Sequence, residues 1–110
     1  MSSESAREYA QGVADGLADI ERDGLPLDDD GQPDLFGWLE GVLDVERVTG
    51  SDGELRRVRL LVAFGGPNCW VEFGPSGAEV QASWWSDVER VWAACPTFAD
   101  QVLEVFASSG

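Results

Sequence analysis

The hydrophobic period changes once along this chain of 110 residues, near Leu43, and this change constrains the fold more than any other feature. Before it, apolar residues recur every three or four positions, which is typical of an amphipathic helix. After it, apolar and polar residues alternate, which is typical of strands with one buried face. The sequence therefore predicts an α+β fold: an antiparallel β-meander of about four strands, with an N-terminal and a C-terminal helix packed on it.

The length of the chain predicts a single domain with one core. We expect a helical, acidic N-terminal part over residues 1–41, the β-meander over residues 42–93 and a C-terminal helix over residues 97–107. Five Trp and five Phe predict an aromatic-rich core. Cys69 and Cys95 are expected to be reduced and buried, because nothing else in the chain indicates secretion.

The N-terminal helix is predicted to begin after a serine cap at position 2 or 3 and to run to about Asp23, where Gly24 ends it. Its buried stripe has spacings of three and four and consists of Ala6, Tyr9, Val13, Leu17 and Ile20. Gly12 and Gly16 each weaken a helix by roughly 1 kcal/mol relative to alanine. We therefore expect a neighbouring element to pack tightly against these two glycines.

The first hairpin is predicted to turn at Ser51 and Asp52. This register places apolar partners on one face of the hairpin and opposite charges on the other. The expected pairs are Leu43 with Leu60, Val45 with Val58, Asp44 with Arg59 and Glu46 with Arg57. Three arginines, Arg56, Arg57 and Arg59, would then serve mostly in structural pairs and not in a patch that binds nucleic acid.

The other expected elements follow from the turns that separate them. Strands are predicted over residues 58–64, 69–73 and 79–84. The expected pairs on the core face are Val62 with Val71 and Phe64 with Cys69. Residues 87–94 fit either a helix or a final strand, and we expect a strand. Thr97 is predicted to cap the last helix.

The charge of the chain is strongly negative and unevenly distributed. There are 21 Asp and Glu residues against seven Arg, with neither Lys nor His, which gives a formal net charge of −14. Residues 1–54 hold 15 of the acids and three of the arginines. Such a surface repels nucleic acid and anionic membranes and attracts basic protein surfaces. Adaptation to high salt would also add acids, but it would spread them over the whole surface.

These acids define the candidate binding surface. The candidate partner-binding residues are Glu4, Glu8, Asp15, Asp19, Glu21, Asp23, Asp28, Asp29, Asp30, Asp34 and Glu40. On the first helix, carboxylates four residues apart lie about 6 Å from each other, close to the spacing of phosphates along one DNA strand. An ordinary solvated helix face is the alternative interpretation of the helical acids.

The residue types that the chain lacks argue against catalysis. Without His there is no usual general base, and without Lys there is no Schiff-base nucleophile, so we expect no enzymatic activity and no cofactor. Residues 28–30 do not fill the positions of an EF-hand, and two Cys fall short of a zinc site, so no metal is expected. Neither a membrane-spanning run nor a signal peptide is evident, which predicts a cytoplasmic protein.

The pair Trp84-Trp85 permits two interpretations. Side chains of neighbouring strand residues point to opposite faces, so one Trp is expected in the core and the other partly exposed. The exposed one is either an anchor for a protein partner or a part of ordinary packing.

The segment from Leu60 to Asp87 carries the turn Gly65-Gly66-Pro67-Asn68, then Trp70 and then the pair Trp84-Trp85. This segment, about a quarter of the chain, resembles small acidic proteins of phages and mobile elements. The resemblance implies a setting in the cytoplasm of a host cell, where such proteins include anti-CRISPR and antirestriction inhibitors that mimic DNA.

We therefore expect an acidic inhibitor that occupies the basic nucleic-acid groove of a DNA-targeting complex, such as a CRISPR effector. Its partner would be a basic nucleic-acid-binding protein, with no direct contact to nucleic acid. An immunity protein or antitoxin that neutralises a basic nuclease is one alternative. A domain adapted to high salt, with no mimicry, is another.

Overall fold

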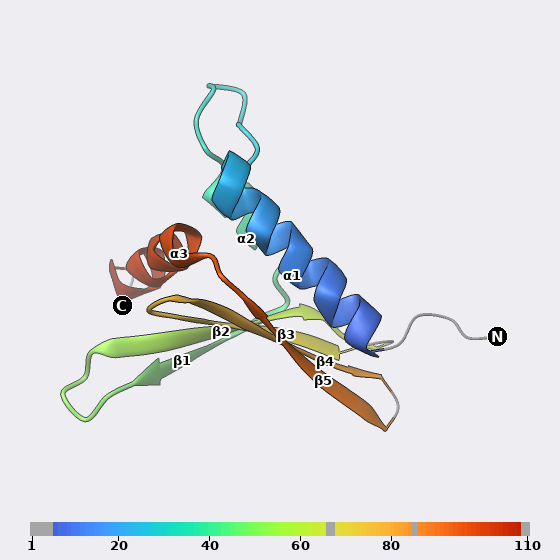
Figure 1. Ribbon diagram of the computed structural model, residues 1–110. Coiled ribbons are helices and arrows are strands. Elements are labelled where there is room, and N and C mark those ends of the chain that lie inside the picture. Colours follow the sequence, from blue (N-terminus) through green and yellow to red (C-terminus); the bar gives the residue numbers. More distant parts are fainter. Residues whose placement is uncertain (1–5, 66–67, 85, 109–110) are drawn as a thin grey trace.

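The computed structural model describes residues 6–65, 68–84 and 86–108, which form an open antiparallel sheet of five strands with three helices (Figure 1). The elements are α1 (Ala6–Asp23), α2 (Leu35–Leu39), β1 (Asp44–Thr49), β2 (Leu55–Ala63), β3 (Asn68–Gly74), β4 (Gly77–Trp84), β5 (Asp87–Ala93) and α3 (Pro96–Ser108). The strands are adjacent in chain order. The predicted α+β meander is confirmed, with five strands because residues 87–93 form the last one.

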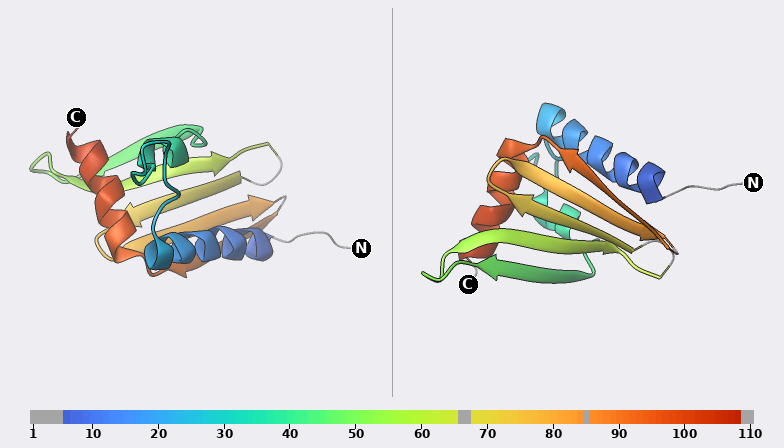
Figure 2. Two further views of the ribbon diagram at one scale, coloured as in Figure 1. Left: turned by 90° about the horizontal axis from the view of Figure 1, so that it is seen from above. Right: turned by 60° about the horizontal axis from the view of Figure 1, so that its bottom comes forward.

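The helices lie on one face of the sheet (Figure 2). α1 runs along β4 and β5, whereas α3 packs on β2, β3 and β4. The sheet residues that are buried beneath the helices are Val58, Leu60, Cys69, Val71, Phe73, Ala78, Val80, Ala82 and Ala93. Trp38 of α2 meets Phe73 and Phe98 edge-on, with ring centroids 6.1 and 5.1 Å away. This aromatic cluster joins α2 to the sheet and to α3.

α1 makes its closest contacts through small side chains. Ala6, Ala10, Ala14 and Leu17 are buried, whereas the predicted stripe residues Tyr9, Val13 and Ile20 are only half-buried. The helix is therefore rotated relative to the prediction, because alanine allows its backbone to lie close to the sheet. Gly24 ends the helix with φ +87°, a conformation that glycine adopts readily. The predicted serine cap lies outside the described residues.

The expectation that an element packs against Gly12 and Gly16 is wrong. A Cβ atom added at either glycine would have nothing within 4 Å, and both residues are exposed. Within the described part of the chain, packing therefore gives no reason for glycine at these two positions.

The predicted register of the first hairpin is wrong by two residues. Val45 pairs with Leu60 and Glu46 pairs with Arg59. The loop has one residue more than expected, because Gly53 adopts φ +83°, and a bulge after Val48 adds another. Since two shifts of one residue restore the original facing, Val45 shares a face with Val58 and Leu60 as predicted, but every residue of β1 is exposed, so this strand has no buried face.

The predicted register of the second hairpin is also displaced. Leu60, and not Val62, pairs with Val71, and the ladder has an irregularity between Leu61 and Ala63. This irregularity ends the regular pairing early, so Phe64 is 73% exposed and does not reach the core face. Of the four turn residues 65–68, residues 66 and 67 lie outside the described part of the chain.

α3 begins earlier than predicted. Its first residue is Pro96, whose fixed φ suits the first helical position, and the carbonyl of Cys95 accepts the N–H of Ala99. Thr97 therefore lies inside the helix and is not its cap, which corrects the predicted start.

Candidate functional site

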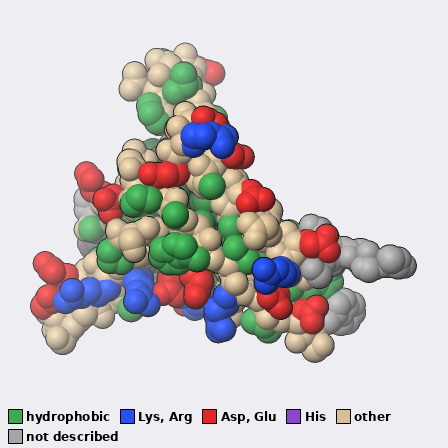
Figure 3. Space-filling model, viewed as in Figure 1, with side chains coloured by type: hydrophobic (Ala, Val, Ile, Leu, Met, Phe, Trp, Pro, Cys, Tyr) green, Lys and Arg blue, Asp and Glu red, His purple; other side chains and the backbone are tan. Residues whose placement is uncertain are grey.

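α1 presents a row of carboxylates directly away from the sheet. At 3.6 residues per turn, Glu8, Asp15 and Asp19 lie within about 40° of one another around the helix axis. They are exposed and lie opposite the buried side of the helix, and we call these three residues the acidic ridge. Acidic side chains follow α1 along its length in Figure 3, whereas most of the basic side chains in that view lie along the sheet. The predicted row also included Glu4, which lies outside the described residues.

The C-terminal end of the ridge is partly neutralised. Arg22 lies 3.0 Å from Asp19 and 2.9 Å from Asp23, measured between the Nη2 atom and the nearest carboxylate oxygens. The hydrogen bonds that Arg22 donates to Asp23 lower the pKa of Asp23. Asp15 has no arginine within ion-pair distance among the described residues, and its carboxylate accepts a hydrogen bond from Gln11 at 2.9 Å. The ridge is therefore most strongly negative in its middle.

The loop between α1 and α2 projects from the body of the protein and holds an acidic tip (Figure 1). Asp28 is used inside the loop, because its carboxylate accepts the N–H groups of Asp30 and Gln32, both at 2.9 Å. Gly31 supplies the turn with φ +79°. The side chains of Asp29 and Asp30 are exposed and have no partner among the described residues. We call these two residues the loop tip.

α2 follows the loop and uses one predicted binding residue for its own structure. Asp34 caps the helix, with its carboxylate accepting the N–H of Gly37 at 2.8 Å. Glu40 ends the helix and has an exposed side chain. Leu27 in the loop and Phe36 on α2 are 66% and 72% exposed, so large apolar side chains lie in the same region as the loop tip.

Glu21 connects α1 to α3. Its carboxylate accepts the backbone N–H of Phe98 at 2.9 Å and that of Thr97 at 3.3 Å. The first N–H groups of a helix have no partner inside the helix, and they favour a negative charge. The hydrogen bond from Phe98 is the main cause that holds the pKa of Glu21 below its ordinary value. This carboxylate therefore has a structural role, which its place in the sequence did not indicate.

The bare face of the sheet neutralises most of its own charge. Arg59 lies 2.7 Å from Glu46, and Arg57 lies 3.0 Å from Glu72, measured between the closest nitrogen and oxygen atoms. Arg59 also covers the ring of Trp70, at 4.6 Å from its centroid. The structure thus confirms that Arg57 and Arg59 form structural pairs, although Arg57 pairs with β3 and not with β1.

Trp84 is half-buried and packs against the core. Trp85 lies outside the described residues, so the prediction for the second member of the pair stays a prediction. Trp92 is 56% exposed at the end of β5 on the bare face.

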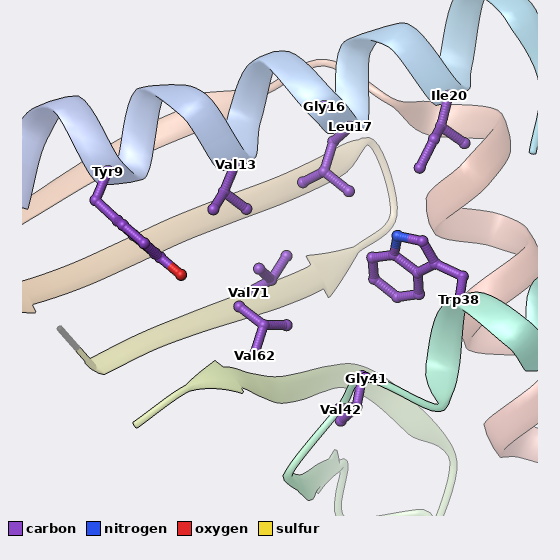
Figure 4. A pocket seen from close by; sticks show the side chains of 10 residues that line it. All are labelled: Tyr9, Val13, Gly16, Leu17, Ile20, Trp38, Gly41, Val42, Val62 and Val71. Atoms are coloured by element: carbon purple, nitrogen blue, oxygen red, sulfur yellow. The ribbon is translucent and has the colours of Figure 1, made fainter. Parts of the chain in front are cut away.

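The helix-bearing face contains a groove that the sequence did not indicate, with a volume of about 320 Å³ (Figure 4). Its lining residues are Tyr9, Val13, Gly16, Leu17, Ile20, Trp38, Gly41, Val42, Val62 and Val71. We call it the α1–α2 groove. The half-buried side of α1 forms one wall, so the departure of Tyr9, Val13 and Ile20 from a tightly packed stripe is the local sign of the groove.

Both cysteines are free and buried, as predicted. Burial raises the pKa of each thiol to about 11, and for Cys95 the charge of Glu21 adds to the effect. A raised pKa disfavours the thiolate, which is the reactive form.

The described residues hold neither a candidate metal site nor a helix that could span a membrane. No three His, Cys, Asp or Glu side chains in this part of the chain are gathered so that they could hold a metal ion. No helix among these residues is long and apolar enough to cross a bilayer.

Comparison of the chain with protein-family models, with curated proteins and with solved structures finds no match. The fold and the surface therefore define only a class: a two-layer α+β domain with one bare sheet face and an acidic helix, loop and turn at the other side.

Proposed function

We propose that this protein is a non-enzymatic inhibitor that occupies the basic nucleic-acid groove of a DNA-targeting protein or complex. Its carboxylates would lie where the phosphates of duplex DNA otherwise bind. The acidic ridge and the loop tip carry this proposal, because both point into solvent. The absence of His and Lys from the chain supports a binding role over a catalytic one.

The distribution of ion pairs between arginines and acids supports the same interpretation. Among the described residues, ion pairs with acids are made by Arg7, Arg22, Arg56, Arg57, Arg59 and Arg90, and the last four of these lie on the sheet. Exposed acids outside these ion pairs lie on α1, at the loop tip and at Glu40, and others lie elsewhere, at Asp44, Glu54, Asp87, Asp100 and Glu104. Arginine contacts to carboxylates are charge-assisted and resemble arginine contacts to phosphates, so a DNA-binding groove offers suitable partners.

The apolar side chains beside the loop tip would add to the binding. Leu27 and Phe36 are exposed next to the carboxylates, and contacts of this type do not weaken with salt. The complex should therefore lose affinity with rising salt, but less steeply than a purely ionic complex would.

The test begins with capture of the partner from a host lysate on the immobilised protein, followed by elution with duplex DNA. The dissociation constant of the purified partner is then measured for two variants with the same net charge. One carries Asn at Asp15, Asp19, Asp29 and Asp30. The control carries neutral amides at four exposed acids elsewhere: Glu54, Asp87, Asp100 and Glu104.

We expect the first variant to bind at least about tenfold more weakly, which corresponds to about 1.4 kcal/mol, and the control to stay near the wild type. Asp28 and Asp34 are left unchanged, because they hold the loop and α2. Equal losses in both variants would reduce the effect to net charge alone and contradict a defined surface. Failure of duplex DNA to elute the partner would contradict mimicry, and a captured nuclease toxin would favour an immunity protein.

A further inference from the structure

The α1–α2 groove exists because the helices cover the sheet incompletely. α1 contacts β4 and β5, and the five residues of α2 are too few to cover the middle strands. Seen from above, α1 and α2 stand on either side of these strands (Figure 2). Val62 and Val71 form part of the groove between the two helices.

The chemistry of the groove suits apolar side chains. None of its ten lining residues carries a charge, and most are aliphatic or aromatic. Most of these side chains are half-buried, so the groove is open to solvent, and Figure 4 shows Tyr9 at one end and Trp38 at the other. A volume of about 320 Å³ lies at the lower end of the range for ligand pockets, which is about 300–1,000 Å³. The groove therefore fits a few apolar side chains better than a large ligand.

Gly12 and Gly16 leave the α1 wall without side chains beside the groove. Gly16 lines the groove, and Gly12 lies one turn earlier on the helix. Neither glycine is required by packing, since an added Cβ would have nothing within 4 Å. Two glycines four residues apart give the helix a flat strip on which the backbone of another helix can approach closely.

Acidic side chains lie near the groove, although none of them lines it. On α1, Asp15 and Asp19 of the acidic ridge lie beyond Gly12 and Gly16 around the helix, and Glu40 precedes Gly41 on the opposite wall. Asp15 and Glu40 have no arginine within 4 Å among the described residues, whereas Asp19 shares Arg22 with Asp23. This arrangement repels DNA and anionic lipid, and it complements a segment that combines apolar anchors with Lys or Arg.

We propose that the α1–α2 groove binds a basic amphipathic helix of the partner protein. The apolar face of that helix enters the groove, its backbone passes over Gly12 and Gly16, and its basic side chains reach Asp15, Asp19 and Glu40. Apolar residues at i, i+3 and i+4 are the usual anchors in this mode of recognition. This inference rests on the proposed function, because it names the part of the basic partner that the protein holds.

The test uses the full chain and a synthetic amphipathic helix of leucine and lysine in helical order. A peptide of the same composition in scrambled order is the control probe. We expect the helical peptide to perturb the amide resonances of Gly12 and Gly16 and the indole N–H of Trp38. We expect it to bind at least tenfold more tightly than the scrambled peptide.

The decisive variant is the double substitution Gly12→Ala and Gly16→Ala. It should raise the thermal midpoint of the free protein, because alanine favours the helix, and weaken binding of the peptide at least fivefold, because the two methyl groups block the close approach. Ala18→Leu adds bulk on the far side of α1 and should leave the affinity unchanged. A stabilised variant cannot lose binding through misfolding, so the two readouts separate structure from recognition.

Three results would overturn the inference: equal binding of both peptides, unchanged affinity of the double variant, or self-association of the free protein through the groove, which would make a second copy the occupant. The proposed function is tested separately. If neutralising the ridge and loop tip abolishes capture of the partner while the glycine variant binds it normally, the groove inference fails and the inhibitor proposal stands. If neither variant affects the partner, both fail.

Discussion

Glu21 was predicted to bind a partner, but its carboxylate has a structural role in the fold. It belongs to the acidic N-terminal half, yet it accepts two backbone N–H groups of α3 across 76 and 77 residues of chain. Its charge is favoured there by the unpaired donors at the start of the helix. The same helix therefore presents acids to solvent on one side and uses one internally on another.

This contact makes stability depend on pH in a defined direction. Since the pKa of Glu21 is lowered in the folded state from 4.5, its contribution to stability is present above about pH 4.5 and is lost as the pH falls through the folded-state value. Glu21→Gln should therefore lower the urea midpoint at pH 7 and show a smaller further loss between pH 5 and pH 3. Asp29→Asn removes the same charge and is the reference. Parallel curves for Glu21→Gln and the wild type would contradict this role.

The two thiols should be inert in the native protein. Cys69 and Cys95 are fully buried, and burial raises their pKa to about 11. At pH 8 we expect neither to react with iodoacetamide until urea unfolds the chain, as followed by mass spectrometry. The raised pKa also means that their contribution to stability is present below about pH 9 and falls as the pH rises towards 11. Rapid labelling of native protein would contradict the buried positions.

At the scale of elements, the contribution of the α2 cap to the free energy of unfolding can be measured directly. Asp34 holds the first turn of a helix of five residues, and an N-cap of this type contributes about 1 kcal/mol. Asp34→Ala should lower the free energy of unfolding by about this amount, whereas Asp29→Ala at the loop tip should leave it within about 0.5 kcal/mol. Chemical denaturation of both variants checks this. Equal effects would mean that Asp34 is as dispensable to the fold as the loop tip.

The elements themselves were predictable because their signals are local. Periodicity located α1 and the strands. The registers were not predictable, because they depend on the left-handed conformation of Gly53 and on two irregularities in the ladder. The start of α3 was placed too late because its donors are satisfied by a residue of another helix.

The exposed acids of the candidate surface were predictable from the sequence, whereas the α1–α2 groove was not. The outward position of Asp15 and Asp19 follows from helical spacing, and the exposure of Asp29 and Asp30 follows from their place in a loop rich in Gly and Pro. The α1–α2 groove was not predictable, because it depends on how far α2 lies from α1 on the sheet. In the sequence, only the two glycines of α1, which no neighbouring side chain requires, are a sign of it.

For the whole molecule, the net charge of −14 should make the free protein more stable in moderate salt. The acids of α1 and the loop tip repel one another in dilute buffer, and the Debye length falls from about 30 Å at 0.01 M to about 10 Å at 0.1 M salt. We expect a folded protein in 10 mM buffer whose urea midpoint rises as NaCl is added. The rise should be smaller when Asn replaces Asp15, Asp19, Asp29 and Asp30. An unfolded chain in dilute buffer would favour adaptation to high salt.

The way in which α1 docks has a consequence for the order of folding. Each strand pairs with its neighbour in the chain, so the hairpins close short loops and can form as soon as they are made. α1 is synthesised before the strands, yet it packs on β4 and β5 and is joined to α3, which are synthesised after the first three strands. Its apolar side therefore stays uncovered until β4, β5 and α3 have left the ribosome. Throughout that interval the acidic ridge on its other side keeps α1 charged and hydrated, and this effect does not depend on any partner.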